Sequence, residues 1–214
     1  MNFICEKGWA FYWGTSEWPP EYISRAIELC DRKGWHKPIV EQPQYNMLWR
    51  DRFEKEYRYL FSEYKYGSTI WSPLASGLLS GKYNSGDVPE GSRFDNHSVT
   101  KSIWERHFGN GKKDKTVEKL NKLADLAKEL GYSQAQLTLA WAIANGDVSV
   151  CLLGFSRVSQ VEENVKAIEL FRKWTQEIED KVNGILDNSP EFDLNWRTWR
   201  PLAFRRQEAL KKTQ

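Results

Sequence analysis

Short apolar runs alternate with longer amphipathic segments along the chain, which is the pattern of strands followed by helices. Four runs rich in β-branched or aromatic residues each end in small or polar side chains: 10–16, 39–42, 68–72 and 149–154. Runs that are apolar on both faces are typical of buried parallel strands. The alternation predicts four strand and helix pairs joined by right-handed crossovers, and therefore an α/β fold.

Apolar residues at helical spacing predict the helices, several of which carry start signals. The predicted helices cover about 20–33, 51–66, 117–130, 133–143, 156–168 and 174–186. Pro19-Pro20 suits the start of the first, and Asp51 and Ser133 are expected N-caps. Ser159 with Glu162 is expected to form a capping box. Residues 81–113 lack a sustained period and are predicted to form a long loop.

Small or polar residues stand at the carboxyl ends of the four predicted strands. They are Ser16, Gln42, Ser72 and Gly154. Because ligands of parallel α/β proteins bind at the carboxyl ends of the strands, we expect a ligand site along this edge.

The stretch from Trp71 to Lys82 carries the clearest local chemistry. Pro73 lacks a backbone donor, so strand pairing must stop there. The small residues that surround it let backbone amides approach a ligand closely, and Lys82 adds a positive charge suited to a phosphate. The same residues are also typical of a simple turn, and only their place among four strand ends favours a ligand site.

Composition narrows the class of protein. The 214 residues include 31 Lys and Arg against 29 Asp and Glu, so no general attraction to nucleic acid or membranes is expected. The three cysteines form no Cys-x-x-Cys pair and the three histidines show no metal-ligand spacing, which indicates reduced thiols and no metal site. Since no apolar run approaches the roughly 20 residues of a membrane helix, a soluble, cytoplasmic protein without membrane insertion is predicted.

Four motifs in register identify a known family. They are Trp13-Gly14-Thr15-Ser16-Glu17-Trp18, Glu41-Gln42-Pro43-Gln44-Tyr45-Asn46, Trp71 to Lys82, and Gly154 to Asn164. In order and spacing they resemble the aldo-keto reductase superfamily, and most closely the β subunits of voltage-gated potassium channels and their plant and microbial relatives. The resemblance covers about residues 1–168. It implies a partial (β/α)8 TIM barrel, with strands five to eight and their helices in residues 1–188 and a tail in 189–214.

The resemblance also implies an NADPH site. In it, Ser16 and Gln42 hydrogen-bond the nicotinamide carboxamide and Trp71 stacks on the nicotinamide ring. Ser72, Leu74, Ala75 and Gly77 match the family's loop around the pyrophosphate. Lys82 and Arg93 match its cationic side chains near the phosphates. The residues that match the part of the site that holds the adenosine end are Gly154, Ser156, Gln160, Glu163 and Asn164. Glu17 stands where channel β subunits commonly carry arginine, and it is expected to weaken cofactor binding if it points at the phosphates. Gly91 stands where an aromatic residue is frequent.

The family's catalytic aspartate, tyrosine and lysine lie on the first four strands, and none of those motifs occurs in this sequence. Tyr12 and Tyr45 lie near strand ends but outside the catalytic motif. The chain alone is therefore expected to be inactive, as the NADPH-binding half of an oxidoreductase that reduces aldehydes or ketones. Two alternatives remain. The chain could be an NADPH-sensing regulatory subunit that docks on a potassium channel's cytoplasmic domain, or a truncated fragment without independent function. The resemblance also implies a homo-oligomer, which in this family is a tetramer.

Four parallel strands cannot close a barrel of eight, so the strands at 10–16 and 149–154 are expected to show open edges. Another chain, a longer gene product or a second copy could supply the missing half, or the chain folds only in part. The tail is interpreted either as a partner surface or as a strap packed across the barrel. Its prominent residues are Trp196, Arg197, Trp199, Arg200 and Arg205.

Overall fold

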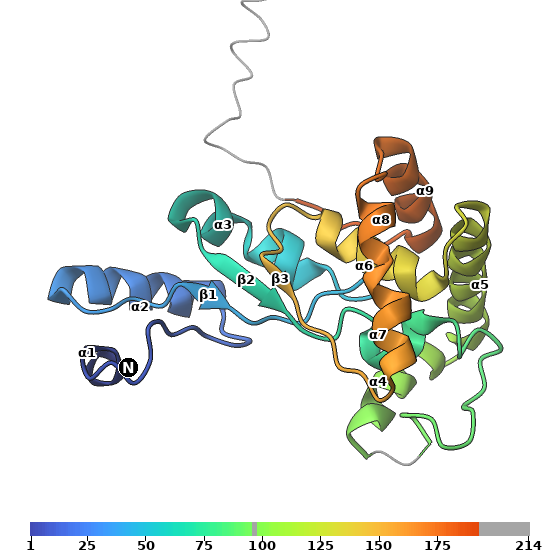
Figure 1. Ribbon diagram of the computed structural model, residues 1–214, viewed down its shortest axis with the longest axis horizontal. Coiled ribbons are helices and arrows are strands. Elements are labelled where there is room, and N and C mark those ends of the chain that lie inside the picture. Colours follow the sequence, from blue (N-terminus) through green and yellow to red (C-terminus); the bar gives the residue numbers. More distant parts are fainter. Residues whose placement is uncertain (96–97, 193–214) are drawn as a thin grey trace, which may run out of the picture.

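A computed structural model describes residues 1–95 and 98–192 of the chain, in which short strands alternate with longer helices (Figure 1). The elements are α1 (Asn2–Glu6), α2 (Pro20–Lys33), β1 (Val40–Glu41), η1 (Arg52–Glu56), α3 (Arg58–Tyr64), β2 (Gly67–Ile70), η2 (Ala75–Ser80), α4 (Ser98–Phe108), α5 (Lys113–Glu129), α6 (Gln134–Ala144), β3 (Val150–Cys151), α7 (Val158–Val165), α8 (Ala167–Phe171) and α9 (Gln176–Leu186). The named residues of the predicted tail, from Trp196 to Arg205, lie outside the described part of the chain.

The strands form one parallel sheet in the order β1-β2-β3, as the alternation of strands and helices predicted. Val40 pairs with Gly67, and Thr69 pairs with Val150. Neighbours in the sheet are therefore neighbours in the sequence, each reached by a crossover that contains helices. The prediction of an α/β fold with a parallel sheet is confirmed.

The predicted buried strand at 10–16 is wrong. Only Thr15 forms an isolated parallel bridge, to Glu41 beside β1. Phe11 and Tyr12 are 89% and 72% exposed, because this segment hydrogen-bonds to the β1 segment on one side and, among the described residues, has no strand partner on the other. The outer edges of this segment and of β3 are both unpaired in the described part of the chain.

Most of the predicted helices are present, and two of the predicted caps are not. Ser133 caps α6 in a capping box with Gln136, as expected. Asp51 makes no side-chain cap, and the chain enters α3 through the π-helical turn η1. Ser159 lies inside α7, whose N-cap is Arg157, so the Ser159 capping box is wrong. The predicted long loop contains the helix α4, which the weak apolar period of its sequence did not reveal.

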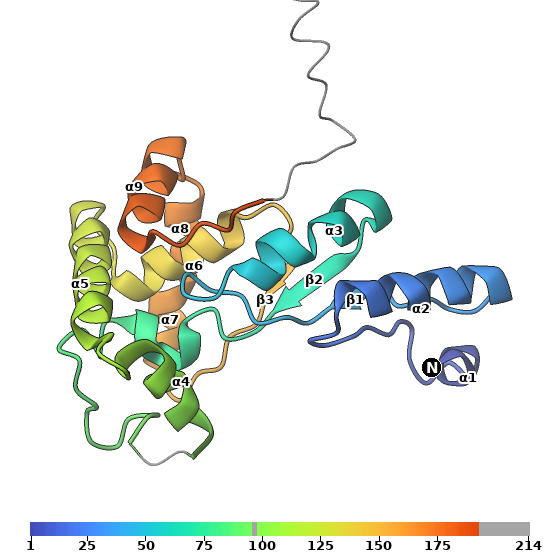
Figure 2. The same ribbon diagram turned by 180° about the vertical axis from the view of Figure 1, so that it is seen from behind.

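Helix α6 is the centre of the core. Residues 134–142 are all buried, and the helix packs against α5, α7, α8, η2 and β3. It lies between the sheet and α5 in the views from the front and from behind (Figures 1 and 2). Helices α1 and α2 lie at the opposite end of the molecule from α5 and α9. No described helix combines the length and apolar character required to cross a membrane.

Candidate functional site

The carboxyl ends of the strands lie in a row along one edge of the sheet. Gln42 N–H donates to Thr15 O at 2.8 Å, which places Ser16 beside Gln42. Gln44 forms a parallel bridge with Trp71, and Leu152 N–H donates to Ile70 O at 2.9 Å. The four segments at the ends of the predicted strands therefore lie side by side, in the order that the sequence predicted.

Ser16 and Gln42 form the first part of this edge. Ser16 Oγ donates to the backbone oxygen of Gln42 at 2.9 Å, and both residues are exposed. Within the described chain, the Gln42 side-chain amide has no hydrogen-bond partner. A free amide next to a hydroxyl offers both a donor and an acceptor, which is the donor set that a carboxamide requires.

Trp71 lies further along the edge and is held there by Glu17. The Trp71 indole N–H donates to Glu17 Oε1 at 3.0 Å, and the backbone N–H of Gln44 donates to the same oxygen at 2.5 Å. Arg52 Nε lies 3.9 Å from Glu17 Oε2. The Glu17 carboxylate therefore faces the indole N–H of Trp71. Through these hydrogen bonds it links three neighbouring segments: its own, the one that follows β1 and the one that follows β2.

Sequence reasoning treated Glu17 only as a departure from the family pattern and missed this role. Glu17 directly follows Ser16 at a predicted strand end, which places it on the same edge of the sheet as Trp71. This position was the signal from which a contact between the two residues could have been predicted. Its backbone has a φ of 57°, a left-handed conformation that non-glycine residues adopt rarely. The unusual backbone is consistent with a side chain held in one place by several partners.

The loop after Trp71 has the tightly wound backbone that its small residues suggested. Positive φ angles occur at Ser72 (54°), Ala75 (50°), Ser76 (58°) and Gly77 (103°). The amides of the last three residues donate within the loop, to Ser72 O, Ser72 Oγ and Leu74 O. Since these amides already have partners, the loop is preformed, and the positive charge for a phosphate must come from side chains.

Lys82 and Arg93 are the side chains predicted to supply that charge. Both are exposed, and neither makes an ion pair within the described residues. Within the described residues, no hydrogen bond or ion pair joins their side chains to Trp71 or to the segment before α7. They lie on the long connection between η2 and α4, from which they remain available to an anion.

The segment around the start of α7 carries the residues predicted for the adenosine end of the cofactor. Gly154 and Ser156 are exposed, and Gln160 Oε1 accepts from the backbone N–H groups of Ser156 and Arg157 at 2.9 and 3.2 Å. The Gln160 oxygen thus holds the loop in shape. Glu163 is exposed, whereas Asn164 is the buried residue of α7.

The buried carboxyl group of Glu41 holds in place the loop that carries Ser16 and Glu17. Glu41 is fully buried and accepts from the Thr15 hydroxyl, from the Trp18 backbone N–H at 3.2 Å and from the Tyr57 hydroxyl at 3.4 Å. Burial raises the pKa of Glu41, and the hydrogen bonds oppose this only in part. Glu41 therefore anchors residues 15–18, the loop that carries Ser16 and Glu17.

Replacing Glu41 with glutamine is expected to change how stability depends on pH. The carboxyl pKa is 4.5 in the unfolded chain and higher in the folded chain, so the folded state retains more protons as the pH rises from 4.5. Wild-type stability falls in that window, and the Glu41→Gln variant lacks this loss. Urea unfolding between pH 4 and 8 should show the variant gaining relative to wild type. Parallel pH profiles would contradict the assignment.

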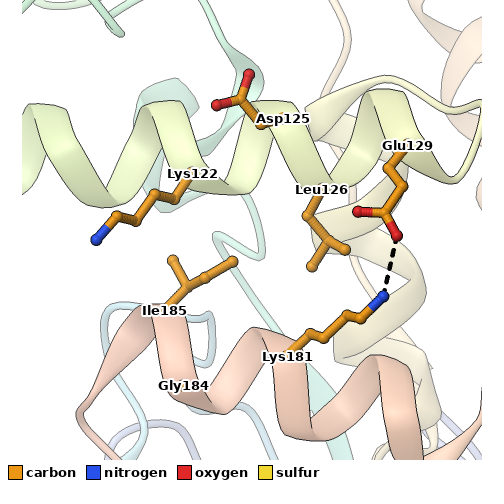
Figure 3. A pocket seen from close by; sticks show the side chains of 7 residues that line it. All are labelled: Lys122, Asp125, Leu126, Glu129, Lys181, Gly184 and Ile185. Carbon is orange, nitrogen blue, oxygen red and sulfur yellow. Dashed lines mark hydrogen bonds and ion pairs between the residues drawn. The ribbon is translucent and has the colours of Figure 1, made fainter.

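Two surface grooves are lined by other residues. One, of about 340 Å³, runs between α5 and α9, where Lys181 Nζ bonds Glu129 Oε1 at 2.9 Å (Figure 3). The other, of about 550 Å³, is lined in part by Arg50, Glu54 and Trp141. Neither groove includes a predicted site residue. The described residues contain no group of three or more His, Cys, Asp or Glu side chains placed to hold a metal ion.

Comparison with known proteins gives consistent matches. The sequence model of the Aldo/keto reductase family matches residues 4–183. The chain is 41% identical over 197 residues to a probable voltage-gated potassium channel subunit beta of Arabidopsis thaliana, and 40% identical over 197 residues to a probable one of Oryza sativa subsp. japonica. It is 41% identical over 194 residues to a putative voltage-gated potassium channel subunit beta of Schizosaccharomyces pombe. The matches cover 92%, 92% and 91% of this chain but 58%, 58% and 55% of the relatives.

Proposed function

The chain belongs to the aldo/keto reductase family, and from this premise we propose that it is the NADPH-binding, carboxyl-terminal half of a carbonyl reductase of the potassium-channel β-subunit type. In this proposal its strand segments are strands five to eight of a (β/α)8 barrel, and the protein is cytoplasmic. The order of four strand-end motifs supports the assignment. The matched part of the chain spans 58% and 55% of the length of two of these relatives.

The observation that carries the proposal is the row formed by Ser16, Gln42 and Trp71. An exposed hydroxyl and a free side-chain amide would bind a carboxamide, and the neighbouring indole would provide a flat surface for the attached ring. Lys82 and Arg93 would neutralise phosphates, which fits a nicotinamide dinucleotide that carries an additional 2′-phosphate. When bound, NADPH supplies a hydride to a carbonyl carbon.

We propose that this chain by itself does not reduce carbonyls. A proton donor is needed at the carbonyl oxygen, and the two tyrosines near strand ends are poor candidates. Tyr45 is buried, its hydroxyl donates to Glu54 at 2.7 Å, and burial raises its pKa well above the usual range. Tyr12 is 72% exposed, and within the described residues its hydroxyl has no hydrogen-bond partner that would position it. The chain's own residues would bind and orient the cofactor.

Cofactor binding is tested by calorimetric titration of the 214-residue chain with NADPH. The wild-type chain is expected to bind, and Trp71→Ala is expected to weaken binding about tenfold, because a stacked aromatic partner is lost. Trp9→Ala, the same change at a side chain that is 73% exposed, is the control and should bind like wild type. NADH should bind more weakly than NADPH. Absence of NADPH binding by the wild-type chain would refute the proposed function.

A second candidate is an NADPH-sensing regulatory subunit of a voltage-gated potassium channel, favoured by the names of the relatives. It predicts that the chain, or a longer product that contains it, is retained by an immobilised cytoplasmic channel domain. It also predicts that retention changes with the oxidation state of the added cofactor. Equal retention by the channel domain and by an unrelated immobilised protein would count against this candidate.

A further inference from the structure

We propose that Glu17 orients the Trp71 ring and makes this stacking surface select a cationic ring over a neutral one, and thus favours oxidised over reduced nicotinamide. The inference rests on the proposed function, since it names which form of the cofactor the same site prefers. Its source is the pair of hydrogen bonds that one carboxylate oxygen accepts from Trp71 Nε1 and from the Gln44 backbone.

Glu17 holds the Trp71 ring in one orientation. Trp71 directly follows β2, and its backbone is still paired, by its N–H to Pro43 O at 3.0 Å and by the bridge to Gln44, but this pairing does not fix the orientation of its ring. Its indole N–H is bonded to Glu17 at 3.0 Å, and Glu17 is itself fixed by Gln44 and by Arg52. A tryptophan ring that is bonded through its N–H has its plane defined before any ligand arrives. Such preorganisation lowers the entropic cost of stacking.

The negative charge of Glu17 acts on any ring that stacks on Trp71. The carboxylate lies at the edge of the indole, so a ring stacked on that tryptophan would lie within a few ångströms of it. The charges that face the carboxylate are those of Arg52, at 3.9 Å, and of Glu56, which lies 3.7 Å from Arg52. Together the three groups carry one net negative charge. A pyridinium cation is therefore attracted to this position, whereas a neutral dihydropyridine is not.

The Glu17 side chain is 39% exposed, so water screens the attraction and the expected effect is moderate. An exposed ion pair of this kind changes affinity by roughly two- to fivefold. The effect is nevertheless specific, because removing the charge should alter the affinity for a cation and leave that for a neutral ring almost unchanged. A purely structural role for Glu17 would alter both affinities alike.

The test uses two small probes, the cation 1-methylnicotinamide and neutral nicotinamide, which do not depend on the rest of the cofactor site. Quenching of tryptophan fluorescence is measured for the full chain, and subtracting the signal of Trp71→Phe isolates the contribution of Trp71. In Glu17→Gln the amide oxygen can still accept both hydrogen bonds, but the charge is gone. The preference for the cation is expected to fall two- to fivefold. Glu169→Gln, an exposed change on α8, is the charge control and should keep the wild-type preference.

Glu17→Ala is the second variant, since it removes the hydrogen bonds as well. It should weaken the quenching of Trp71 by both probes. Equal preference for the cation in wild type and Glu17→Gln would overturn the inference, as would equal quenching by the two probes in wild type. If the wild-type chain binds no NADPH while its Trp71 keeps the cation preference, the proposed function fails and the inference about Glu17 stands.

Discussion

Replacing Arg50 with methionine is expected to lower the free energy of unfolding by about 3–5 kcal/mol, because it leaves the largely buried carboxylate of Glu54 without its cation. Arg50 and Glu54 are only 7% and 13% exposed, and they form a two-point contact at 2.9 and 3.0 Å. Arg50 also donates to Asn183 Oδ1 at 2.7 Å, which ties this turn to α9. Chemical denaturation of the two proteins measures the difference.

Two further variants separate the charge effect from the loss of packing. Arg50→Met combined with Glu54→Gln should recover part of the lost stability, since no buried charge is then left unpaired. Lys37→Met removes the cation of a pair with Asp31 whose side chains are 50% and 57% exposed, and it should cause no measurable change. A stability of Arg50→Met within about 1 kcal/mol of wild type would contradict the importance of the pair.

Replacing Trp141 with alanine is expected to cost about 3–5 kcal/mol through the cavity that it leaves in the core. Trp141 is 2% exposed and stacks on Tyr45 with ring centres 5.0 Å apart, while the Arg50 guanidinium lies 5.3 Å from its ring centre. The residue stands on α6, which packs against α5, α7, α8, η2 and β3, so the cavity cannot close easily. Urea denaturation followed by circular dichroism measures the loss.

The matched control is Trp9→Ala, which removes the same atoms from a side chain that is 73% exposed. Its effect should stay within about 0.5 kcal/mol. Trp141→Phe should cost less than Trp141→Ala, because a smaller ring can still stack on Tyr45. Equal losses for Trp9→Ala and Trp141→Ala would mean that burial on α6 does not determine stability.

The sequence predicted those parts of the fold that depend on local signals. Helix α2 ends at Gly34, whose φ of 66° is the left-handed cap that glycine favours, and Ser133 caps α6 as its sequence suggested. The predicted strand at 10–16 failed because its aromatic composition does not say whether a neighbour exists on both sides. Burial of a strand is a tertiary property, which β propensity alone cannot supply.

The order of the strands along the chain was enough to predict where the candidate site lies. The strand ends that carry Ser16, Gln42 and Trp71 meet because parallel strands share an edge. The partners of individual side chains were not predictable, since they depend on rotamers and on packing. Asn164 turned into the core and the Glu17 carboxylate turned toward Trp71, and no spacing rule indicates either orientation.

Two outer edges of the sheet have no pairing partner among the described residues, and this makes the stability of the protein dependent on what surrounds it. Phe11 and Val150, near these edges, are 89% and 46% exposed. Any segment that pairs with such an edge binds the folded form and not the unfolded form, so by mass action it raises the melting temperature. At one hundred times its dissociation constant, such a segment adds about 2.7 kcal/mol. The melting temperature is therefore expected to rise with the concentration of any molecule that covers these edges, and thermal unfolding becomes an assay for finding one.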